Sequence, residues 1–328
     1  GAFVSFASAK IAVQPAWLRQ GPQVRADLLG RIADAIEMRS VELGTMLARE
    51  EGKILPEAVG EVRRAAQIFR FYAGEALRIA GEALASVRAD VDVTVTRDPL
   101  GVVGLITPWN FPAAIPAWKI APALAYGNAV VLKPADLVPG TAHLLAQIIH
   151  DAGCPAGLFN LVMGPGSVVG NAMIEHPEIA GISFTGSVQT GRSIARSALT
   201  DMKKIQLEMG GKNPMVVLND ADLDLAVAAC LNGAFFSTGQ RCTASSRLIV
   251  EDGIHDAFVK KLAAQMVALR VGPALDATSQ IGPVASAQQL KSNLAYVDLA
   301  RAEGCDVIGG ARVNGPTEGY FQQPALFL

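Results

Sequence analysis

The sequence predicts an α/β protein built around a parallel sheet, and three observations support this prediction. Short apolar strands alternate with helices between residues 102 and 197. These strands are apolar on both faces, as in parallel sheets that helices cover on both sides. A stretch of β-branched alternation at residues 91–96 predicts a second, small β element outside that sheet.

Composition limits the kind of protein. The chain has 328 residues, 51% of them hydrophobic, which is enough for a large core and roughly two domains. A net charge of −2 with scattered Lys and Arg residues disfavours nucleic acid as a partner. No apolar run reaches the roughly 18 residues of a membrane span. We therefore expect a soluble protein that binds neither nucleic acid nor membrane.

The four cysteines, Cys154, Cys230, Cys242 and Cys305, are widely spaced. Their spacing matches neither a metal site nor a disulfide framework. No basic segment precedes an apolar run at the N-terminus, so no secretion signal is predicted. The expected location is the cytoplasm, and no metal is expected.

The N-terminal part, residues 22–82, is predicted to be helical. Apolar residues recur every four positions from Val24 to Ile36, and residues 57–77 repeat the pattern. Such faces are typical of helices that pack on a core and carry no chemistry. Residues 83–100 then predict an exposed strand or hairpin, which leaves backbone groups unpaired unless it joins another sheet. This segment is a candidate assembly element.

Repeated strand and helix units follow. Strands are predicted at residues 102–106, 129–132, 159–163 and 181–184, with helices at residues 116–126, 141–152, 168–175 and 190–197. Ligands of such sheets bind beyond the carboxyl ends of the strands. Three of these ends carry unusual residues, beginning at Thr107, Lys133 and Thr185. A ligand site is therefore expected at this edge of the sheet.

The C-terminal part is predicted less completely. Gly210 and Gly211 mark a plausible domain boundary, and a strand at residues 215–218 leads into a helix that opens at residues 220–224. Beyond it, the pattern predicts a helix at residues 255–269, loops, and a strand at the last two residues.

Two glycine-rich turns join strands to helices, at residues 164–170 and 186–191. Glycine lets a phosphate approach the backbone, and a helix N-terminus favours negative charge, so a dinucleotide could bind there. The spacing is not Gly-x-Gly-x-x-Gly, and plain turns are an equal alternative. Lys133 could donate to ribose hydroxyls or be a solvated lysine at a loop start.

Cys242 follows a Gly-Gln-Arg turn after an apolar segment. It is either a nucleophile or a buried apolar cysteine. Glu208 favours the first reading, because burial at a strand end would raise its pKa towards that of a general base. The alternative is a carboxylate held by backbone N–H groups.

Six motifs resemble the aldehyde dehydrogenase superfamily in order and spacing, from about Gln23 to the last residue. They are Thr107-Pro108-Trp109-Asn110-Phe111-Pro112, residues 117–128 (AWKIAPALAYGN), Lys133-Pro134-Ala135-Asp136, Phe184-Thr185-Gly186-Ser187, residues 207–212 (LEMGGK) and Gly239-Gln240-Arg241-Cys242. Within the superfamily, the chain looks most similar to the 2-oxoglutarate semialdehyde (2,5-dioxovalerate) dehydrogenase branch.

The resemblance implies catalytic roles. Cys242 would form a thiohemiacetal with the aldehyde, and the Asn110 amide with the Cys242 N–H would stabilise its oxyanion. Glu208 would activate the water that hydrolyses the thioester, with Lys119 in a proton-relay path near it. Members that transfer the acyl group to coenzyme A usually lack this carboxylate, so Glu208 implies a free acid as product.

The resemblance also implies the ligand sites. NAD is the expected cofactor, with NADP as the alternative, because Asp136 should repel a 2′-phosphate but is shorter than the family's usual glutamate. The implied cofactor residues are Ile106, Thr107, Pro108, Trp109, Lys133, Ala135, Asp136, Gly166, Gly170, Phe184, Thr185, Gly186, Ser187, Met209 and Gly210. The implied substrate residues are Phe111, Trp118, Arg241 and Thr243.

The implied architecture has three parts. Residues 1–82 and 101–210 form a Rossmann-like NAD(P)-binding domain, residues 83–100 an oligomerisation element of a homodimer or homotetramer, and residues 211–328 an α/β catalytic domain. The family chain normally continues through a Glu-Ile-Phe-Gly-Pro segment. That segment is not in this sequence, so we expect the C-terminal part of the catalytic domain to be missing.

The substrate prediction depends on Arg241. A guanidinium next to Cys242 could hold the distal carboxylate of 2-oxoglutarate semialdehyde by a bidentate pair, or it could be structural. Succinate and glutarate semialdehydes are alternative substrates. A catalytically silent nucleotide-binding fragment is the alternative from another class.

Overall fold

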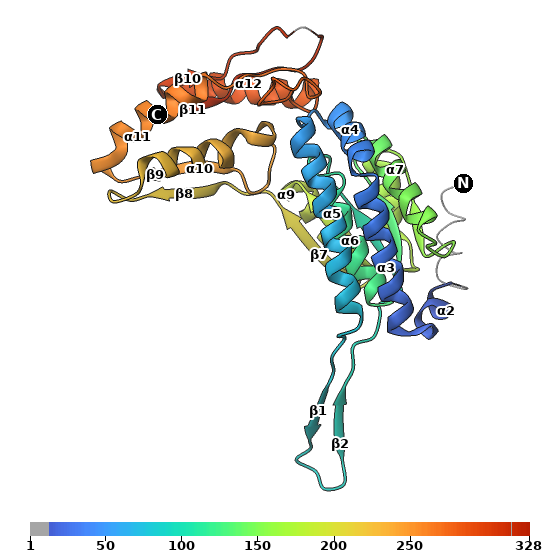
Figure 1. The fold of residues 1–328 in the computed structure, drawn as a ribbon. Helices are drawn as coiled ribbons and strands as arrows, with labels where there is room; N and C mark the ends of the chain where they lie inside the picture. Colours follow the sequence, from blue (N-terminus) through green and yellow to red (C-terminus); the bar gives the residue numbers. More distant parts are fainter. Residues whose placement is uncertain (1–12, 316) are drawn as a thin grey trace. The chain divides into compact units, whose positions relative to one another are not determined.

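The computed structural model describes residues 13–315 and 317–328, which form a mixed α/β protein with a parallel sheet (Figure 1). Residues 1–12 of the predicted first domain lie outside the described part. The described residues fall into two compact units. The first comprises Glu61–Glu208 with the residues up to Leu43, and the second comprises Met209–Leu328 with Gly44–Gly60.

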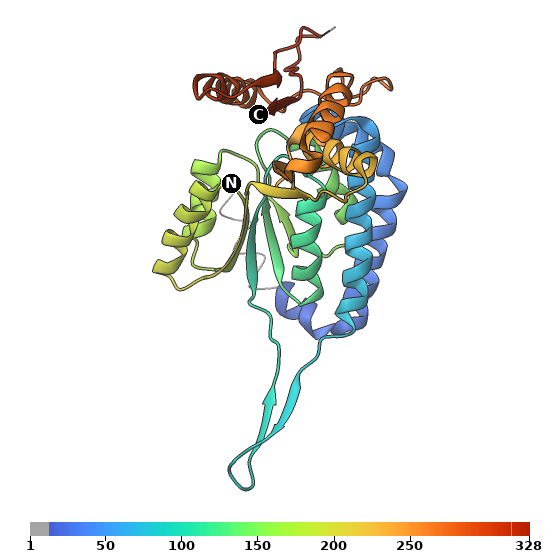
Figure 2. The same cartoon turned by 90° about the vertical axis from the view of Figure 1, so that its left-hand side faces the viewer.

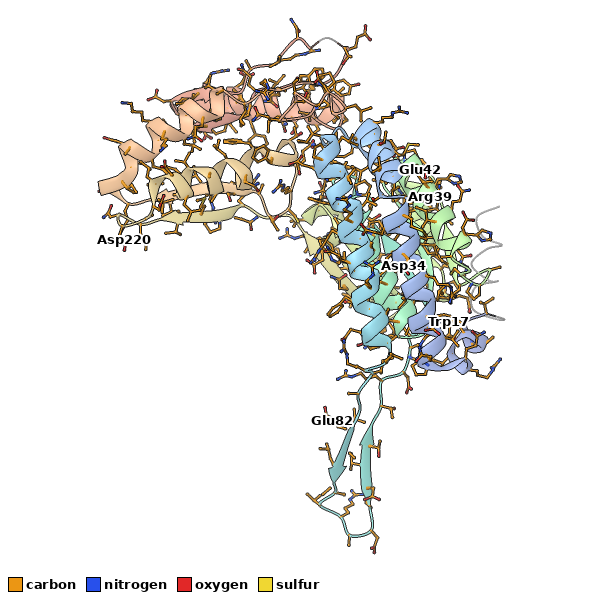
Figure 3. All side chains as sticks on the ribbon, viewed as in Figure 1. Trp17, Asp34, Arg39, Glu42, Glu82 and Asp220 are labelled. Carbon is orange, nitrogen blue, oxygen red and sulfur yellow. The ribbon has the colours of Figure 1, made fainter. Side chains whose placement is uncertain are left out.

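The N-terminal part forms α2 (Gln14–Arg19), α3 (Gly21–Met38), α4 (Ser40–Glu51) and α5 (Leu55–Ala76). The prediction of helix up to residue 82 is wrong at its end, because a strand begins at Glu82. Gly52 separates α4 from α5 with a φ of 96°, a left-handed conformation that suits glycine. Trp17, labelled in Figure 3, is buried, and its indole Nε1 donates to Leu124 O at 3.2 Å.

The sheet of the first unit has the strand order β5-β4-β3-β6-β7. Its strands are β3 (Val102–Ile106), β4 (Ala129–Lys133), β5 (Phe159–Leu161), β6 (Ile179–Gly186) and β7 (Lys204–Met209). The central strand β3 is parallel to both neighbours, β4 and β6. The chain adds β4 and β5 on one side of β3 and then β6 and β7 on the other. The topological switch point, where ligands of doubly wound sheets bind, is therefore at the carboxyl ends of β3 and β6.

Helices cover this sheet on both faces, as the sequence predicts. They are α6 (Ala114–Ala125), α7 (Pro139–Asp151), α8 (Asn171–Glu175) and α9 (Val188–Thr200). In Figure 2 the yellow-green α9 lies on one side of the strands and the teal α6 on the other. All of β4 is buried. The helix predicted at residues 168–175 begins as a π-helical turn, η2 (Gly166–Gly170), before α8.

Residues 82–95 form an antiparallel hairpin of β1 (Glu82–Ala85) and β2 (Asp92–Val95). Both strands are exposed along their full length. Leu84 lies opposite Val93, so two apolar side chains share one face of the ribbon. A two-stranded ribbon of this kind has little stability of its own.

The second unit packs α10 (Leu223–Phe235) and α11 (Asp252–Val267) on a parallel pair of strands, β8 (Asn213–Val217) and β9 (Ser245–Val250). The turn η3 (Phe236–Gly239) follows α10. Further along are α12 (Ala287–Ala302) and the antiparallel pair β10 (Val307–Gly309) and β11 (Ala325–Phe327). The sequence predicts no element at β9, α12 or β10. In α12 the buried apolar positions, Leu290, Val297 and Ala300, are too sparse for a clear helical period.

Gly44–Gly60 belongs to the second unit, whereas the sequence assigns it to the first domain. The backbone N–H of Leu55 donates to Ala274 O at 3.0 Å. Gly52 lies against Pro283, where an added Cβ would come within 2.8 Å of the ring. These long-range contacts attach the segment to the C-terminal half of the chain.

Candidate functional site

The ends of three strands meet at one edge of the first unit. In the parallel register Ile106 of β3 is the partner of both Lys133 of β4 and Phe184 of β6. The loops that start at Thr107 and Pro134 and the turn at Gly186 therefore leave the sheet side by side. This arrangement matches the edge that the sequence predicts for a ligand.

Lys133 and Asp136 form a charged pair at this edge. Lys133 Nζ lies 3.0 Å from Asp136 Oδ1 and donates to Pro134 O at 2.6 Å. The lysine side chain is 5% exposed and that of Asp136 is 55% exposed. The lysine is therefore buried and paired, not solvated, and it presents a fixed donor beside an accessible carboxylate.

Thr107 and Ser187 are polar residues that follow the neighbouring strands β3 and β6. Thr107 donates its N–H to Lys133 O at 3.1 Å, and its hydroxyl is buried with no hydrogen-bond partner among the described residues. Ser187 caps α9, because its Oγ accepts from the Thr190 N–H at 3.2 Å. Gly186 is required by close packing, since a Cβ there would lie 2.5 Å from the Phe184 ring. Both strand ends thus bring polar groups to this edge of the sheet.

The loop after β3 carries Trp109, Asn110 and Phe111, which are half-buried. It runs into α6, and Glu61 of α5 accepts from the N–H groups of Ala113 and Ala114 at 2.9 and 3.1 Å. A carboxylate at a helix N-terminus satisfies N–H groups that have no partner within the helix. Glu61 therefore fixes the backbone directly after the Asn110 loop. The local sequence does not reveal this role of Glu61, because its hydrogen-bond partners lie 52 and 53 positions away.

Lys119 is linked to Glu208 through two side chains of neighbouring strands. Its Nζ donates to Ser183 Oγ at 2.6 Å and to Gln206 Oε1 at 3.2 Å. Ser183 also donates to Gln206 Oε1. Gln206 Nε2 donates to Glu208 Oε1 at 2.7 Å. With its oxygen occupied by two donors, the Gln206 amide presents its NH₂ group to the Glu208 carboxylate.

Burial changes the acidity of Lys119, which is 8% exposed. Desolvation disfavours its charged form and lowers its pKa to about 8, although the nearby Glu208 carboxylate opposes the shift. An amine with this pKa can hold or release a proton near neutral pH. Sequence reasoning missed Gln206 and Ser183. The alternation of strand side chains, which puts Gln206 on the same face as Glu208, is the signal that could have found Gln206.

Glu208 itself is exposed, so the expectation of a buried carboxylate is wrong. It lies near the end of β7, an edge strand with β6 as its single neighbour. An edge strand covers fewer side chains than a central one. Met209 and Gly210, which follow, are exposed as well, and so is Trp118 on α6.

In the second unit Cys242 is exposed and is a free thiol. The alternative of a buried apolar cysteine is therefore wrong. Its carbonyl oxygen accepts from Asn213 Nδ2 of β8 at 2.7 Å. The neighbouring Thr243 is exposed too. The thiol stands on a loop whose backbone is attached to a strand.

Arg241 has polar partners within the second unit. Its Nη2 lies 3.4 Å from Glu57 Oε1, and its Nη1 lies 3.4 Å from Asn232 Oδ1. Burial raises the pKa of the Glu57 carboxyl. This desolvation outweighs the hydrogen bond from Ser237 and the charge of Arg241, which both lower the pKa. These contacts are those of a structural arginine, the second of the two readings that the sequence leaves open.

Residues 13–315 and 317–328 contain neither a candidate metal-binding cluster nor a candidate membrane-spanning helix. No group of three His, Cys, Asp or Glu side chains is arranged to hold a metal ion. No helix in that part of the chain combines the length and the apolar character needed to cross a bilayer.

The chain is similar to curated semialdehyde dehydrogenases. It is 47% identical over 315 residues to the alpha-ketoglutaric semialdehyde dehydrogenase of Bacillus subtilis, covering 95% of this chain and 64% of that protein. It is 40% identical to the alpha-ketoglutarate semialdehyde dehydrogenase of Haloferax volcanii, covering 97% and 66%. A betaine aldehyde dehydrogenase of Bacillus subtilis is also 40% identical, covering 92% and 62%. The chain thus spans somewhat less than two thirds of the length of these relatives.

Solved structures have the same fold. An NADP-dependent enzyme of E. coli matches with a TM-score of 0.95 and 37% identity over 98% of this chain and 67% of that one. PnpE in complex with nicotinamide adenine dinucleotide matches with a TM-score of 0.96 and 35% identity over 99% and 67%. Residues 4–328 match the Aldehyde dehydrogenase family. The fold, the ordered motifs and these matches lead to one conclusion: the chain belongs to the aldehyde dehydrogenase family.

Proposed function

We propose that the protein oxidises an aldehyde to the free acid with NAD or NADP, through a thioester on Cys242. The observation that carries the proposal is the hydrogen-bonded line from Lys119 through Gln206 to Glu208. It holds in place a carboxylate that can act as the general base for thioester hydrolysis, and links it to an amine whose pKa is about 8. An enzyme that passed its acyl group to coenzyme A would need no such base.

The groups at the edge of the first unit fit a dinucleotide. The Lys133 and Asp136 side chains can bind ribose hydroxyls, and the buried Thr107 hydroxyl has a hydrogen bond left to make. The N-terminus of α9, which begins just after Ser187, suits a phosphate. The nicotinamide ring, when bound, would accept a hydride from the substrate carbon. The remaining residues of the proposed cofactor site are Ile106, Pro108, Trp109, Ala135, Gly166, Gly170, Phe184, Thr185, Gly186, Met209 and Gly210.

Each reacting group has one proposed task. The Cys242 thiolate attacks the aldehyde carbon, and the negative oxygen that forms accepts hydrogen bonds from the Cys242 N–H and the Asn110 amide. After oxidation, Glu208 takes a proton from the water that attacks the thioester. Gln206 orients the Glu208 carboxylate, and Lys119 is the residue that the family resemblance puts in the proton path near it.

The proposed substrate is a short carboxylated semialdehyde, and 2-oxoglutarate semialdehyde is the first candidate. Support comes from the two semialdehyde dehydrogenases above and from a 39% identical 2,5-dioxopentanoate dehydrogenase of Saccharolobus solfataricus. Succinate and glutarate semialdehydes are the alternatives. Arg241 as the carboxylate-binding group, with Phe111, Trp118 and Thr243 around the substrate, stays a prediction from the family resemblance. Its present contacts with Glu57 and Asn232 favour a role in the loop instead.

NAD is the proposed cofactor, with NADP as the alternative. The Asp136 carboxylate is exposed at 55% and would lie near a ribose 2′-phosphate, which it repels. Related solved structures hold either cofactor: betaine aldehyde dehydrogenase of Staphylococcus aureus is in complex with NAD+, and 3,6-anhydro-L-galactose dehydrogenase is in complex with NADP.

We further propose that the exposed hairpin at residues 83–100 assembles the protein into a homodimer or homotetramer. The apolar face of the ribbon, with Leu84 opposite Val93, supports this. A cytoplasmic location is proposed as well, since the thiols of Cys154, Cys230, Cys242 and Cys305 are all free.

The decisive experiment is NADH release by the full gene product with a panel of 2-oxoglutarate, succinate and glutarate semialdehydes and betaine aldehyde. Cys242→Ser should abolish release, whereas Glu208→Gln should give one burst of NADH per site and then stall at the thioester. Glu208→Asp serves as the matched variant that keeps a carboxylate. Steady-state loss without any burst in Glu208→Gln would contradict the hydrolytic role. No release with any aldehyde from the unaltered protein would favour the silent nucleotide-binding reading.

A further inference from the structure

The loop before Cys242 has an unusual backbone. Ser237 (φ 54°, ψ 35°) and Thr238 (φ 56°, ψ 26°) are left-handed, and Gly239 follows with a φ of 64°. Left-handed backbone is unfavourable for residues that have a Cβ, so two in succession persist where the surroundings hold them. Something outside the loop must therefore fix this turn.

Glu57, in the first turn of α5, contacts the turn at its beginning. Both of its carboxylate oxygens accept from the Ser237 N–H, at 3.0 and 3.1 Å. The same carboxylate lies 3.4 Å from Arg241 Nη2, directly before Cys242. The two side chains are 20% and 21% exposed. One carboxylate thus joins the first left-handed residue to the residue next to the thiol.

Neighbouring segments attach the rest of the loop. Thr238 Oγ1 donates to Gly282 O at 3.2 Å. Gln240 Oε1 accepts from the Ala285 N–H at 3.1 Å, and its Nε2 lies 3.4 Å from Glu51 Oε1. These contacts involve neutral acceptors or a long distance, whereas Glu57 offers a charged acceptor, which makes stronger hydrogen bonds. Removing Glu57 should therefore loosen the turn more than removing any one of the others.

The consequence falls on Cys242. Its carbonyl is held by Asn213 after the thiol, and before the thiol Glu57 adds a charged anchor to the contacts of Thr238 and Gln240. A turn that loses this charged anchor would let the thiol and the Cys242 N–H change direction together. Small displacements of a reacting group cost large factors in rate.

We propose that Glu57 is a positioning residue for Cys242, which it orients by holding the Ser237 N–H and the Arg241 guanidinium. The proposal rests on the proposed nucleophilic role of Cys242, and it assigns Arg241 to the loop. Glu57 contacts neither substrate nor cofactor in this scheme. It acts on acylation and leaves cofactor binding unchanged.

The first test measures hydrogen exchange of the peptide that contains Ser237 in the full gene product. Glu57→Ala should speed exchange of the Ser237 amide by at least about tenfold, because that N–H loses its acceptor. Glu57→Gln, whose amide oxygen can still accept but carries no charge, should lie between Glu57→Ala and the unaltered protein. This readout needs no activity, so it stays informative if the proposed function fails. Unchanged exchange in Glu57→Ala would overturn the proposal.

The second test measures the NADH burst. Glu57→Ala should lower the burst rate constant by roughly tenfold to a hundredfold while the Kd for NAD stays the same. Glu57→Gln, which keeps an acceptor for the Ser237 N–H, should restore part of the rate. The matched control is Glu37→Ala, which removes a surface carboxylate 3.6 Å from Arg63 on another helix and should change neither quantity. Equal burst rates in Glu57→Ala and the unaltered protein would overturn the proposal, as would loss of NAD binding.

A double-mutant cycle separates the two partners of Glu57. If Glu57 acts partly through Arg241, then Arg241→Ala should add little to the loss of burst rate in Glu57→Ala. Full additivity of the two losses would show that the guanidinium contact has no part in the positioning.

Discussion

Lys119 and Glu208 lie at the two ends of one hydrogen-bonded line, and their environments differ. Lys119 is buried and its pKa is lowered to about 8, whereas Glu208 is exposed on an edge strand. Gln206 between them has an amide that does not titrate in this pH range. It can therefore orient the carboxylate, and a proton that passes from Glu208 to Lys119 has to travel through water instead of through the amide.

The pH dependence of deacylation should report on Lys119. Below about pH 8 its amine is protonated and cannot accept a proton, and above this pH it can. We expect steady-state NADH release to rise with pH through about 8 in the unaltered protein, and Lys119→Met to lose that rise. A rise that persists in Lys119→Met would exclude the lysine from the proton path.

The same shift affects stability, with a sign that follows from the lowered pKa. The unfolded chain keeps this proton up to its ordinary pKa of 10.5, so the charge on Lys119 opposes folding fully below about pH 8. This opposition is lost as the pH rises from about 8 towards 10.5. We expect the unfolding temperature of the unaltered protein to gain this contribution between about pH 8 and 10.5, and Lys119→Met to lack it. A general loss of structure in Lys119→Met would lower the unfolding temperature at every pH, so the pH dependence separates it from the loss of the titrating group.

At the scale of elements, the N-terminus of α9 influences what can bind at this edge of the sheet. Ser187 caps α9 by accepting a hydrogen bond from the Thr190 N–H, so this N–H is not available to an anion. The neighbouring Gly186 has no room for a side chain because of the Phe184 ring. Packing against Phe184 is therefore one reason for a glycine at this turn, independent of a bound ligand.

Ser187→Ala should destabilise the first unit by about 1 kcal/mol, since the Thr190 N–H loses its cap. Urea unfolding followed by a probe in the first unit measures this loss. Gln189→Ala, which changes an exposed side chain in the same turn, is the matched control and should leave the midpoint unchanged. Equal midpoints for the two variants would mean that the cap contributes nothing measurable.

The hairpin yields the second prediction at this scale. Val93→Lys puts a charge on the apolar face that Leu84 shares, and should reduce the assembly to a smaller species. Light scattering coupled to size exclusion measures the mass. Thr94→Lys alters the opposite face of the same strand and should have no effect. If both variants keep the mass of the unaltered protein, the hairpin does not assemble it.

At the scale of the whole molecule, a bound dinucleotide should stabilise the unit that holds it. At about a hundredfold excess over its Kd, NAD should add about 2.7 kcal/mol to the free energy of unfolding of the first unit. Thermal unfolding with and without NAD measures the shift, which Lys133→Ala should reduce. Lys204→Ala, an exposed lysine of β7, is the control. A shift of equal size in Lys133→Ala would remove that lysine from the cofactor site.

Much of the fold could be predicted from local pattern. The strand predicted at residues 102–106 is β3 with the same bounds, because five apolar residues between turn residues leave few alternatives. By contrast β9 and α12 were missed, since their buried positions are sparse and tertiary packing decides them. The grouping of Gly44–Gly60 with the second unit also depends on distant partners such as Ala274.

The sequence by itself determined the family motifs, their order, the parallel sheet and the residue types that can react, because each depends on composition or short spacing. Tertiary structure alone decided which side chains meet. Glu57 binds Ser237 across 180 positions, and Lys119 reaches Gln206 across 87. It also decided that Glu208 is exposed and Lys133 buried. Spacing cannot encode such contacts, because the path of the chain brings distant segments together and burial sets the protonation of what they carry.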